Sequence, residues 1–255
     1  GIIASVLQYG VPKYSLFFGE LSLDGSLRHT RGAVLMALFA KEQGLQNIFV
    51  PSPSANEAAI IKGVNVYAVD NLSQLAGFLL GKAALQPIIY EEHIENIEDI
   101  EFDMAEVLGQ EYAKRAMEIA AAGSHNILMI GSPGSGKTML ARALPGILPH
   151  LNEEESLEVT KLYSVAGSIP PRGSLITTRP FRSPHHTISQ IGLIGGGQKP
   201  QPGEVSLAHR GVLFLDEFNE FPRSVLESLR QPVEDGVLTI SRDRERVTYP
   251  CRFML

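Results

Sequence analysis

The sequence is short of cysteine, of long apolar runs and of excess positive charge, and each shortage excludes a class of protein. Its single cysteine, Cys251, cannot form a disulfide within the chain, so we expect a reducing, cytoplasmic compartment. No apolar run approaches the roughly 18 residues of a membrane-spanning helix, and residues 1–5 lack the basic start and apolar stretch of a signal peptide, so we expect no membrane partner. The formal net charge of −6 argues against a chain that binds polyanions over its whole surface.

Strand and helix patterns alternate along the first 85 residues, which is typical of an α/β module. Apolar runs predict strands at residues 15–23, 47–51 and 65–69. Apolar periodicity predicts helices at residues 31–43, 55–62 and 72–80. The acidic stretch 86–101 is then predicted to be a linker. The module begins close to its own second half, so we expect further residues before Gly1.

Residues 102–255 repeat this alternation on a larger scale and predict a second α/β domain with a parallel sheet. The expected strands span residues 126–130, 211–215, 237–242 and 247–255. The expected helices span residues 110–122, 138–144, 153–164 and 223–229. Asn152 and Glu155 form a capping-box pattern at the start of the third of these helices. The final residues are apolar and carry no stop signal, so the chain is expected to be a fragment at both ends.

One segment matches the phosphate-binding pattern G-x-x-x-x-G-K-[ST] at every position, between a predicted strand and a predicted helix. Glycines let the backbone curl so that its N–H groups point at phosphate oxygens, and the lysine reaches the β- and γ-phosphates. We therefore predict that the segment binds ATP with Mg²⁺, the ion contacting the threonine hydroxyl. The predicted contacts are Gly131, Pro133, Gly134, Ser135, Gly136, Lys137 and Thr138.

Two carboxylates directly follow the apolar strand predicted at residues 211–215. The carboxyl ends of parallel strands meet at one edge of a sheet, so we expect Asp216 and Glu217 beside the phosphate-binding loop. Asp216 is predicted to hold Mg²⁺ together with Thr138. Glu217 is predicted to orient and deprotonate the attacking water, with Lys137 as the second catalytic residue. A strand-end carboxylate pair that faces solvent is the alternative interpretation.

Positive charge gathers in the C-terminal third of the chain. Residues 172–255 carry 11 Lys and Arg against 9 Asp and Glu, whereas residues 1–100 carry 6 against 10. Arg242, Arg244 and Arg246 lie near the tip of the hairpin predicted at 237–250, where they could contact the phosphates of DNA. Acidic residues alternate with these arginines, so local neutralisation is the alternative.

The stretch 172–210 is longer than a crossover helix requires. Its arginines, prolines and triple glycine predict an exposed, partly flexible insertion, with an ordinary solvated loop as the alternative. His185 and His186 are adjacent within it. No further cysteine or histidine stands at a zinc-ligand spacing from them, so we predict no metal site there.

Taken together, these motifs resemble those of AAA+ ATPases, and Gly109-Gln110 is similar to the adenine-side motif of that class. The stretches 121–126, 181–186 and 229–236 resemble the magnesium-chelatase-like ATPases, with the bacterial YifB/ComM group as the best match. The resemblance implies that the insertion and the hairpin face the pore of a hexameric ring. It also implies an ATPase that acts on DNA, as a branch-migration helicase in natural transformation and recombination.

Residues 19–25 and Arg31-Gly32 resemble the Lon-type, ribosomal-S5-like domain that YifB/ComM proteins carry. Val34 stands where Lon proteases have their catalytic lysine, so the resemblance implies a structural or interaction role for this partial domain. The family extends further at both ends. A sensor-1 residue, an arginine finger and a C-terminal helical lid are therefore expected outside this chain, and the piece alone is expected to hydrolyse ATP weakly or not at all.

Two other functions fit the same motifs. A chelatase-type subunit would use the ATPase to drive metal insertion into a porphyrin, although the Lon-like domain argues against it. A nucleotide-binding scaffold would carry the same loop with little turnover.

Overall fold

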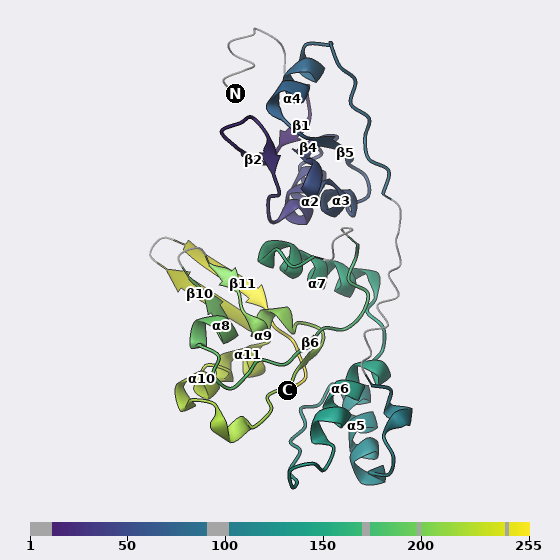
Figure 1. The fold of residues 1–255 in the computed structure, drawn as a ribbon, viewed down its shortest axis with the longest axis vertical. Helices are drawn as coiled ribbons and strands as arrows, with labels where there is room; N and C mark the ends of the chain where they lie inside the picture. The colour runs from purple at the N-terminus through teal and green to yellow at the C-terminus, as the bar shows by residue number, and fades with distance from the viewer. Residues whose placement is uncertain (1–11, 91–101, 170–173, 198–199, 243–244) are drawn as a thin grey trace. The chain divides into compact units, whose positions relative to one another are not determined.

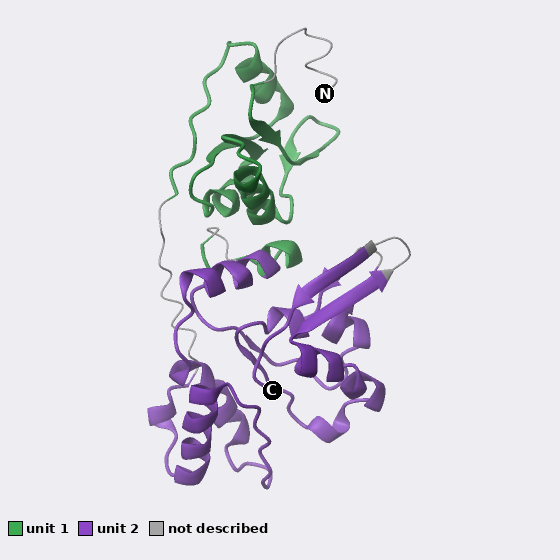
Figure 2. Ribbon diagram, turned by 180° about the vertical axis from the view of Figure 1, so that it is seen from behind, with its two compact units in different colours: residues 1–95, 163–175 green, residues 96–162, 176–255 purple. Residues whose placement is uncertain are grey.

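The computed structural model describes two compact units, which Figure 2 shows in separate colours. The first unit comprises residues 1–95 and 163–175, and the second comprises residues 96–162 and 176–255. The described residues are 12–90, 102–169, 174–197, 200–242 and 245–255. Most of the predicted acidic linker therefore lies outside the described residues. No helix among the described residues is both long and apolar enough to span a membrane.

The first unit is built on a parallel three-stranded sheet in the order β1-β4-β5 (Figure 1). Its elements along the chain are β1 (Ser15–Phe17), β2 (Glu20–Leu21), β3 (Leu27–Arg28), α2 (Ala33–Glu42), β4 (Asn47–Pro51), α3 (Ser52–Ala59), β5 (Asn65–Val69) and α4 (Leu72–Leu79). The strand register aligns Phe17, Phe49 and Tyr67, whose rings stack at centroid distances of 4.6 and 4.8 Å. Cross-strand aromatic pairs of this kind stabilise a sheet.

The predicted strands at 47–51 and 65–69 are confirmed as β4 and β5, and the predicted helices at 31–43 and 72–80 as α2 and α4. The single strand predicted at 15–23 is wrong, because the structure has two short strands there, β1 and β2. A Cβ on Gly19, between β1 and β2, would lie 2.8 Å from the Pro51 ring, so glycine suits this close approach to β4. The helix predicted at 55–62 lies earlier, as α3, since a proline in its first turn starts it.

The second unit, whose elements are labelled in Figure 1 where there is room, contains the expected parallel sheet, and helices pack on it. Its elements along the chain are η1 (Met104–Glu106), α5 (Glu111–Gly123), α6 (Lys137–Ile147), α7 (Glu153–Ala166, whose end belongs to the first unit), β6 (Phe181–Arg182), α8 (Gln190–Ile194), β7 (Gly195–Gly196), β8 (Gln201–Pro202), α9 (Glu204–Leu207), β9 (Val212–Leu213), η2 (Phe218–Glu220), α10 (Arg223–Glu227), α11 (Arg230–Asp235), β10 (Val237–Arg242) and β11 (Glu245–Pro250). β6 pairs in parallel with β9, and Val212 in turn bridges in parallel to Met254. The Ile127 N–H donates to the Leu255 carbonyl at 2.9 Å. This bond places the extended segment 126–130 next to the last residues of the chain, which bridge to β9.

One apolar cluster joins α5 and α6 to this sheet. Its buried members are Val107, Met117, Ala120, Ala121, Leu140, Leu144, Val212 and Met254. Because the cluster includes residues from both helices and from two sheet segments, it fixes the helix that follows the phosphate-binding loop against the strand that precedes Asp216.

The predicted sheet segments are shorter than expected. The strand predicted at 126–130 is wrong, because these residues are extended but form no regular strand. Their side chains still alternate between half-buried and exposed. Leu128 and Ile130 are 75% and 90% exposed, so these apolar side chains pack on little of the described chain. The strand predicted at 211–215 is reduced to β9, and that predicted at 247–255 is replaced by β11 and the isolated bridge at Met254. β10 and β11 form the predicted antiparallel hairpin, whose tip residues 243–244 lie outside the described residues.

The stretch 172–210 is not an exposed, flexible insertion in its described part, so that prediction is wrong. It forms β6, α8, the β7–β8 hairpin and α9, and it buries Leu193, Val205 and Leu207. The triple glycine has a packing role. Gly195 has φ of 103°, and a Cβ there would lie 2.8 Å from the Gly203 nitrogen, so only glycine allows the two strands this close.

A polar cluster attaches Ser164, near the end of α7, to the rest of the first unit. The buried Glu57 carboxylate lies 2.8 Å from His29 Nε2 and accepts a 3.2 Å hydrogen bond from Ser164 Oγ. The Gly32 N–H donates to the Ser164 carbonyl at 3.1 Å. Because a buried carboxylate is costly without partners, these bonds specify where Ser164 lies.

Candidate functional site

The phosphate-binding pattern forms a turn between the extended residues 126–130 and helix α6. Gly134 and Gly136 have φ of 77° and 85°, a conformation that glycine adopts without strain. The Lys137 ammonium donates to the carbonyls of Gly131 and Ser132, each at 3.0 Å, so it lies over the loop. The N-terminus of α6 adds partial positive charge at the same place. This combination is suited to anions such as phosphate.

The structure brings Thr138 and Asp216 together. The Thr138 hydroxyl donates to Asp216 Oδ2 at 3.1 Å, across 78 positions of sequence. The other oxygen, Asp216 Oδ1, accepts the backbone N–H of Glu217 at 3.0 Å. A hydroxyl and a carboxylate oxygen at this separation are ligands of the kind that Mg²⁺ takes beside a nucleotide. Among the described residues, no group of three or more His, Cys, Asp or Glu forms a metal site of its own.

Glu217 lies next to this pair and contacts a histidine that sequence reasoning did not assign to the site. Its backbone has φ of 52°, an uncommon conformation for glutamate. Its Oε2 lies 3.3 Å from His186 Nδ1. The sequence showed His186 only as half of an adjacent histidine pair. No spacing rule connects it with Glu217, so the contact becomes visible only in the fold.

These side chains border an open cavity of about 1020 Å³. Its polar lining residues are Asn126, Lys137, His186, Asp216, Glu217, Asn219 and Glu220. The extended residues 127–130 and the residues 213–215 supply its apolar wall. A largely apolar cavity with a few convergent polar groups is the usual form of a small-molecule site.

Gly109-Gln110 also lies beside the loop. Both residues have positive φ, 68° and 58°, and Gln110 is the N-cap of α5. The Gln110 side-chain amide donates to the Ser135 carbonyl at 3.1 Å. The segment expected on the adenine side is therefore hydrogen-bonded to the loop expected to hold the phosphates.

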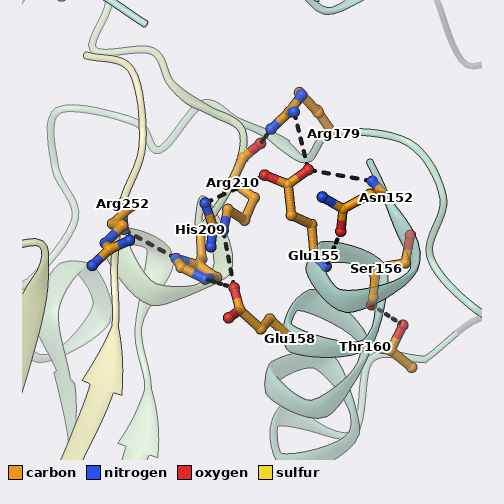
Figure 3. A network of polar contacts seen from close by, with 9 residues as sticks. All are labelled: Asn152, Glu155, Ser156, Glu158, Thr160, Arg179, His209, Arg210 and Arg252. Carbon is orange, nitrogen blue, oxygen red and sulfur yellow. Dashed lines mark hydrogen bonds and ion pairs between the residues drawn. The ribbon is translucent and has the colours of Figure 1, made fainter. Parts of the chain in front are cut away.

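Figure 3 shows a polar network around His209 and Arg210. These two residues precede β9, whereas Asp216 follows it. His209 is only 1% exposed, yet both its ring nitrogens have partners. Nδ1 accepts the Arg252 backbone N–H at 3.0 Å, so Nε2 carries the proton and donates to Glu158 Oε2 at 3.1 Å. Burial lowers the pKa of His209, and the bonds to Glu158 only partly oppose this effect. The ring is therefore held neutral.

Arginines complete the network. Arg210 Nε donates to Glu158 at 2.9 Å, and Arg179 donates to the Arg210 carbonyl at 2.7 Å and to Glu155 at 3.3 Å. Burial acts to raise the pKa of Glu158, but the hydrogen bonds from Arg210 and His209 outweigh it and hold that pKa below its ordinary value. Helix α7 is thus tied to the start of the strand that delivers Asp216 and Glu217.

The hairpin arginines are described only in part. Arg244 and the side chain of Arg242 lie outside the described residues, and Arg246 is exposed on β11. Arg246 is not part of the described lining of the loop cavity. Contact of these arginines with DNA stays a prediction.

The family described as "Magnesium chelatase, subunit ChlI" matches residues 103–255, and "Subunit ChlI of Mg-chelatase" matches residues 1–54. The magnesium-chelatase 38 kDa subunit of Rhodobacter capsulatus is a more distant relative. It is 27% identical over 60% of this chain and 49% of its own length.

Other relatives are more similar. An uncharacterized protein of Mycobacterium tuberculosis is 46% identical over 94% of this chain and 48% of its own length. The uncharacterized protein YifB of Escherichia coli is 44% identical, over 93% and 46%. The competence protein ComM of Haemophilus influenzae is 41% identical, over 94% and 47%. The chain spans about half the length of these relatives. It belongs to the magnesium chelatase, subunit ChlI family, with YifB and ComM among its homologues.

Proposed function

We propose that the protein is an AAA+ motor ATPase that binds ATP with Mg²⁺ and hydrolyses it. The observation that carries this proposal is the 3.1 Å hydrogen bond between the Thr138 hydroxyl and Asp216, beside the Lys137 ammonium. A phosphate-binding loop and a strand-end carboxylate that meet at one point are two of the parts that nucleotide hydrolysis uses.

Different residues of the site would bind different parts of ATP and its Mg²⁺. Lys137 would exchange its bonds to the Gly131 and Ser132 carbonyls for bonds to phosphate oxygens. The loop N–H groups and the N-terminus of α6 would hold the remaining phosphate charge. Thr138 and Asp216 would hold Mg²⁺, which neutralises charge on the β- and γ-oxygens when bound. The Gly109-Gln110 segment, bonded to Ser135, would lie on the adenine side.

Glu217 would orient the attacking water and accept its proton, because its carboxylate directly follows Asp216 and is largely exposed. The water oxygen would attack the γ-phosphorus of the phosphate that Lys137 holds, the bond to the β–γ bridging oxygen would break, and ADP would leave.

We further propose a ring, with hexamer as the expected size, that acts on DNA in the cytoplasm during branch migration or unwinding in competence and recombination. The 41% identity to a competence protein supports this choice. A chelatase-type subunit for metal insertion is the second candidate, favoured by the family description and by the Rhodobacter relative. If the protein neither acts on DNA nor supports metal insertion, we expect it to be a nucleotide-binding scaffold with little ATP turnover.

The test uses the full-length protein, a labelled ATP analogue and forked and single-stranded DNA. We expect Lys137→Ala to abolish nucleotide binding. Glu217→Gln should keep binding but lower turnover by about 100-fold, as loss of a general base does. Glu227→Gln is the matched control, since it removes an exposed carboxylate that does not line the cavity.

The substrates separate the candidates. Stimulation of turnover by DNA supports the DNA motor, and its absence with every DNA form contradicts that part of the proposal. Stimulation by a large chelatase subunit instead supports the second candidate. If Glu217→Gln turns over ATP like the wild type, the role of Glu217 is wrong.

A further inference from the structure

We infer that His209 is a positioning residue, which acts from just before β9 to set where Asp216, just after β9, meets Thr138. This inference rests on the proposed ATPase function and deepens it, because it names a residue outside the cavity lining on which hydrolysis depends. Its basis is the 3.0 Å hydrogen bond in which His209 Nδ1 accepts the Arg252 backbone N–H (Figure 3).

Residues 252–255 lie between β9 and the extended residues 126–130, which lead into the phosphate-binding loop. On the loop side, the Ile127 N–H donates to the Leu255 carbonyl at 2.9 Å, and the Leu255 N–H donates to Asn126 Oδ1 at 2.9 Å. The loop and β9 are therefore joined through residues 252–255. Where Asp216 lies relative to the loop depends on the register of β9 against them.

A ladder of hydrogen bonds sets this register on the β9 side. Met254 makes two backbone bonds, at 2.8 and 2.9 Å, to β9 and to the residue before it. The Arg210 N–H donates to the Arg252 carbonyl at 2.6 Å. The last bond of the ladder is made by a side chain, because the Arg252 N–H donates to the ring of His209. The imidazole therefore fixes the end of the ladder that lies furthest from Asp216.

The His209 ring is itself held in place. It is only 1% exposed, and its Nε2 donates to Glu158 Oε2 on α7 at 3.1 Å. Because Nε2 keeps the proton, Nδ1 stays an acceptor for the Arg252 N–H. The same carboxylate accepts a 2.9 Å hydrogen bond from Arg210 Nε. A buried ring with both nitrogens bonded cannot shift without losing a partner, so it is suited to holding a register.

A small loss of register would separate the two parts of the nucleotide site. Successive residues of a strand are about 3.3 Å apart, so a slip of one residue would break the 3.1 Å contact between Thr138 and Asp216. Even a shift of about 1 Å in a reacting group can lower a rate about 100-fold. β9 is only two residues long, so few bonds resist such a shift. The loop that carries Lys137 is not part of this ladder, so hydrolysis should suffer more than nucleotide binding.

The experiment compares two substitutions of His209 in the full-length protein. In His209→Asn the amide oxygen takes the place of Nδ1 and can accept the Arg252 N–H, while the bond to Glu158 is lost. In His209→Gln the amide lies one bond further from the backbone, so it reaches Glu158 but not the Arg252 N–H.

We expect His209→Gln to lower kcat for ATP about tenfold, since the shift should be smaller than the roughly 1 Å that costs about 100-fold. Its KM for ATP should stay within about twofold of the wild type, as for a change felt mainly in the transition state. His209→Asn should keep the wild-type kcat and KM. A role of His209 in stability alone would not separate the two variants in this way.

Val225→Ala is the control for lost stability, because it truncates a buried side chain on α10 outside the ladder and the cavity lining. Denaturant unfolding compares all three variants, and turnover is measured at a temperature where each is folded. The inference is overturned if His209→Asn loses as much kcat as His209→Gln, if His209→Gln changes only KM, or if Val225→Ala lowers kcat equally. His209→Asn is decisive even if His209→Gln does not fold, because a folded asparagine variant with a kcat well below the wild type contradicts the role of Nδ1.

Amide hydrogen exchange without nucleotide separates failure of this inference from failure of the proposed function. His209→Gln should speed exchange in residues 211–215 and 252–255, because the ladder opens more often, and His209→Asn should leave it unchanged. A wild type without turnover contradicts the proposed ATPase. Equal exchange in His209→Gln and the wild type contradicts the role of His209, whether or not the protein hydrolyses ATP.

Discussion

A histidine that is buried and neutral makes folding stability depend on pH. His209 donates to Glu158 through Nε2 and accepts the Arg252 N–H through Nδ1, so a second proton would break the bond to Arg252. Burial lowers the pKa of His209 in the folded protein, while the unfolded histidine titrates at about 6.5. Below that pH the unfolded chain binds a proton that the folded chain does not, so folding stability falls as pH falls.

We therefore expect the full-length protein to lose stability between pH 7.5 and pH 5.5, by at most about 1.4 kcal/mol per pH unit from this one proton. His209→Gln should show a shallower pH dependence, measured by denaturant unfolding at several pH values. His150→Gln should keep the wild-type dependence, since that residue is exposed. Because the pKa of Glu158 is lowered in the folded protein, folding stability falls further at more acidic pH, where its carboxylate is protonated. Equal slopes for wild type and His209→Gln would contradict the role of His209.

At the scale of single residues, the sequence reveals the parts of a site that are contiguous. Lys137 and Thr138 are recognisable because the loop that carries them is one unbroken pattern. Glu158 and His209 are not recognisable, because their hydrogen bond joins positions 51 apart without a motif at either. His186 was missed for the same reason. Residues that support or restrain a site are defined by tertiary contacts, and a single sequence carries no record of those.

The capping box of α7 offers a test at the scale of one element. Asn152 Oδ1 accepts the Glu155 N–H at 2.9 Å, and the Asn152 N–H donates to Glu155 Oε2 at 3.3 Å. Asn152→Ala should lower the free energy of unfolding by about 1 kcal/mol, because it leaves the first turn with an unsatisfied donor. Asn152→Asp keeps the acceptor and is the control in the same denaturant titration. An alanine variant as stable as the wild type would mean that Arg179 and Arg210 alone hold this end of α7.

Element boundaries were predictable where burial and hydrogen bonding coincide. β4 is the central strand of its sheet and β5 pairs with it over all five residues, and the predicted limits of both apolar runs agree with the structure. Residues 127–130 are equally apolar, but the bonds to the neighbouring sheet segment are one backbone bond from the Ile127 N–H and one bond to the Asn126 side chain, so no regular strand results among these described residues. An apolar pattern indicates which side chains avoid water, whereas a regular strand also requires backbone hydrogen bonds to a neighbouring segment.

At the scale of the whole molecule, the proposed action on DNA depends on the β10–β11 hairpin. Arg246→Ala in the full-length protein should weaken DNA binding in the presence of ATP and reduce the slope of log K against log salt by about 1. Arg223→Ala is the control, because Arg223 is an exposed arginine that pairs with Glu227 on α10. Fluorescence anisotropy over a salt series measures the DNA affinity of each variant and the slope of log K against log salt. Equal losses for the two variants would indicate a diffuse charge effect and no specific contact by the hairpin.

The two units cannot be separated by one cut. The chain passes between them three times, because residues 163–175 return to the first unit from within the second half of the sequence. A protease that cleaves after residue 95 leaves this segment on the other piece, and Glu57 then loses Ser164 as a partner. The same holds for a recombinant fragment that ends near residue 85. To isolate a complete first unit, residues 163–175 would have to be added as a peptide or joined to it by circular permutation.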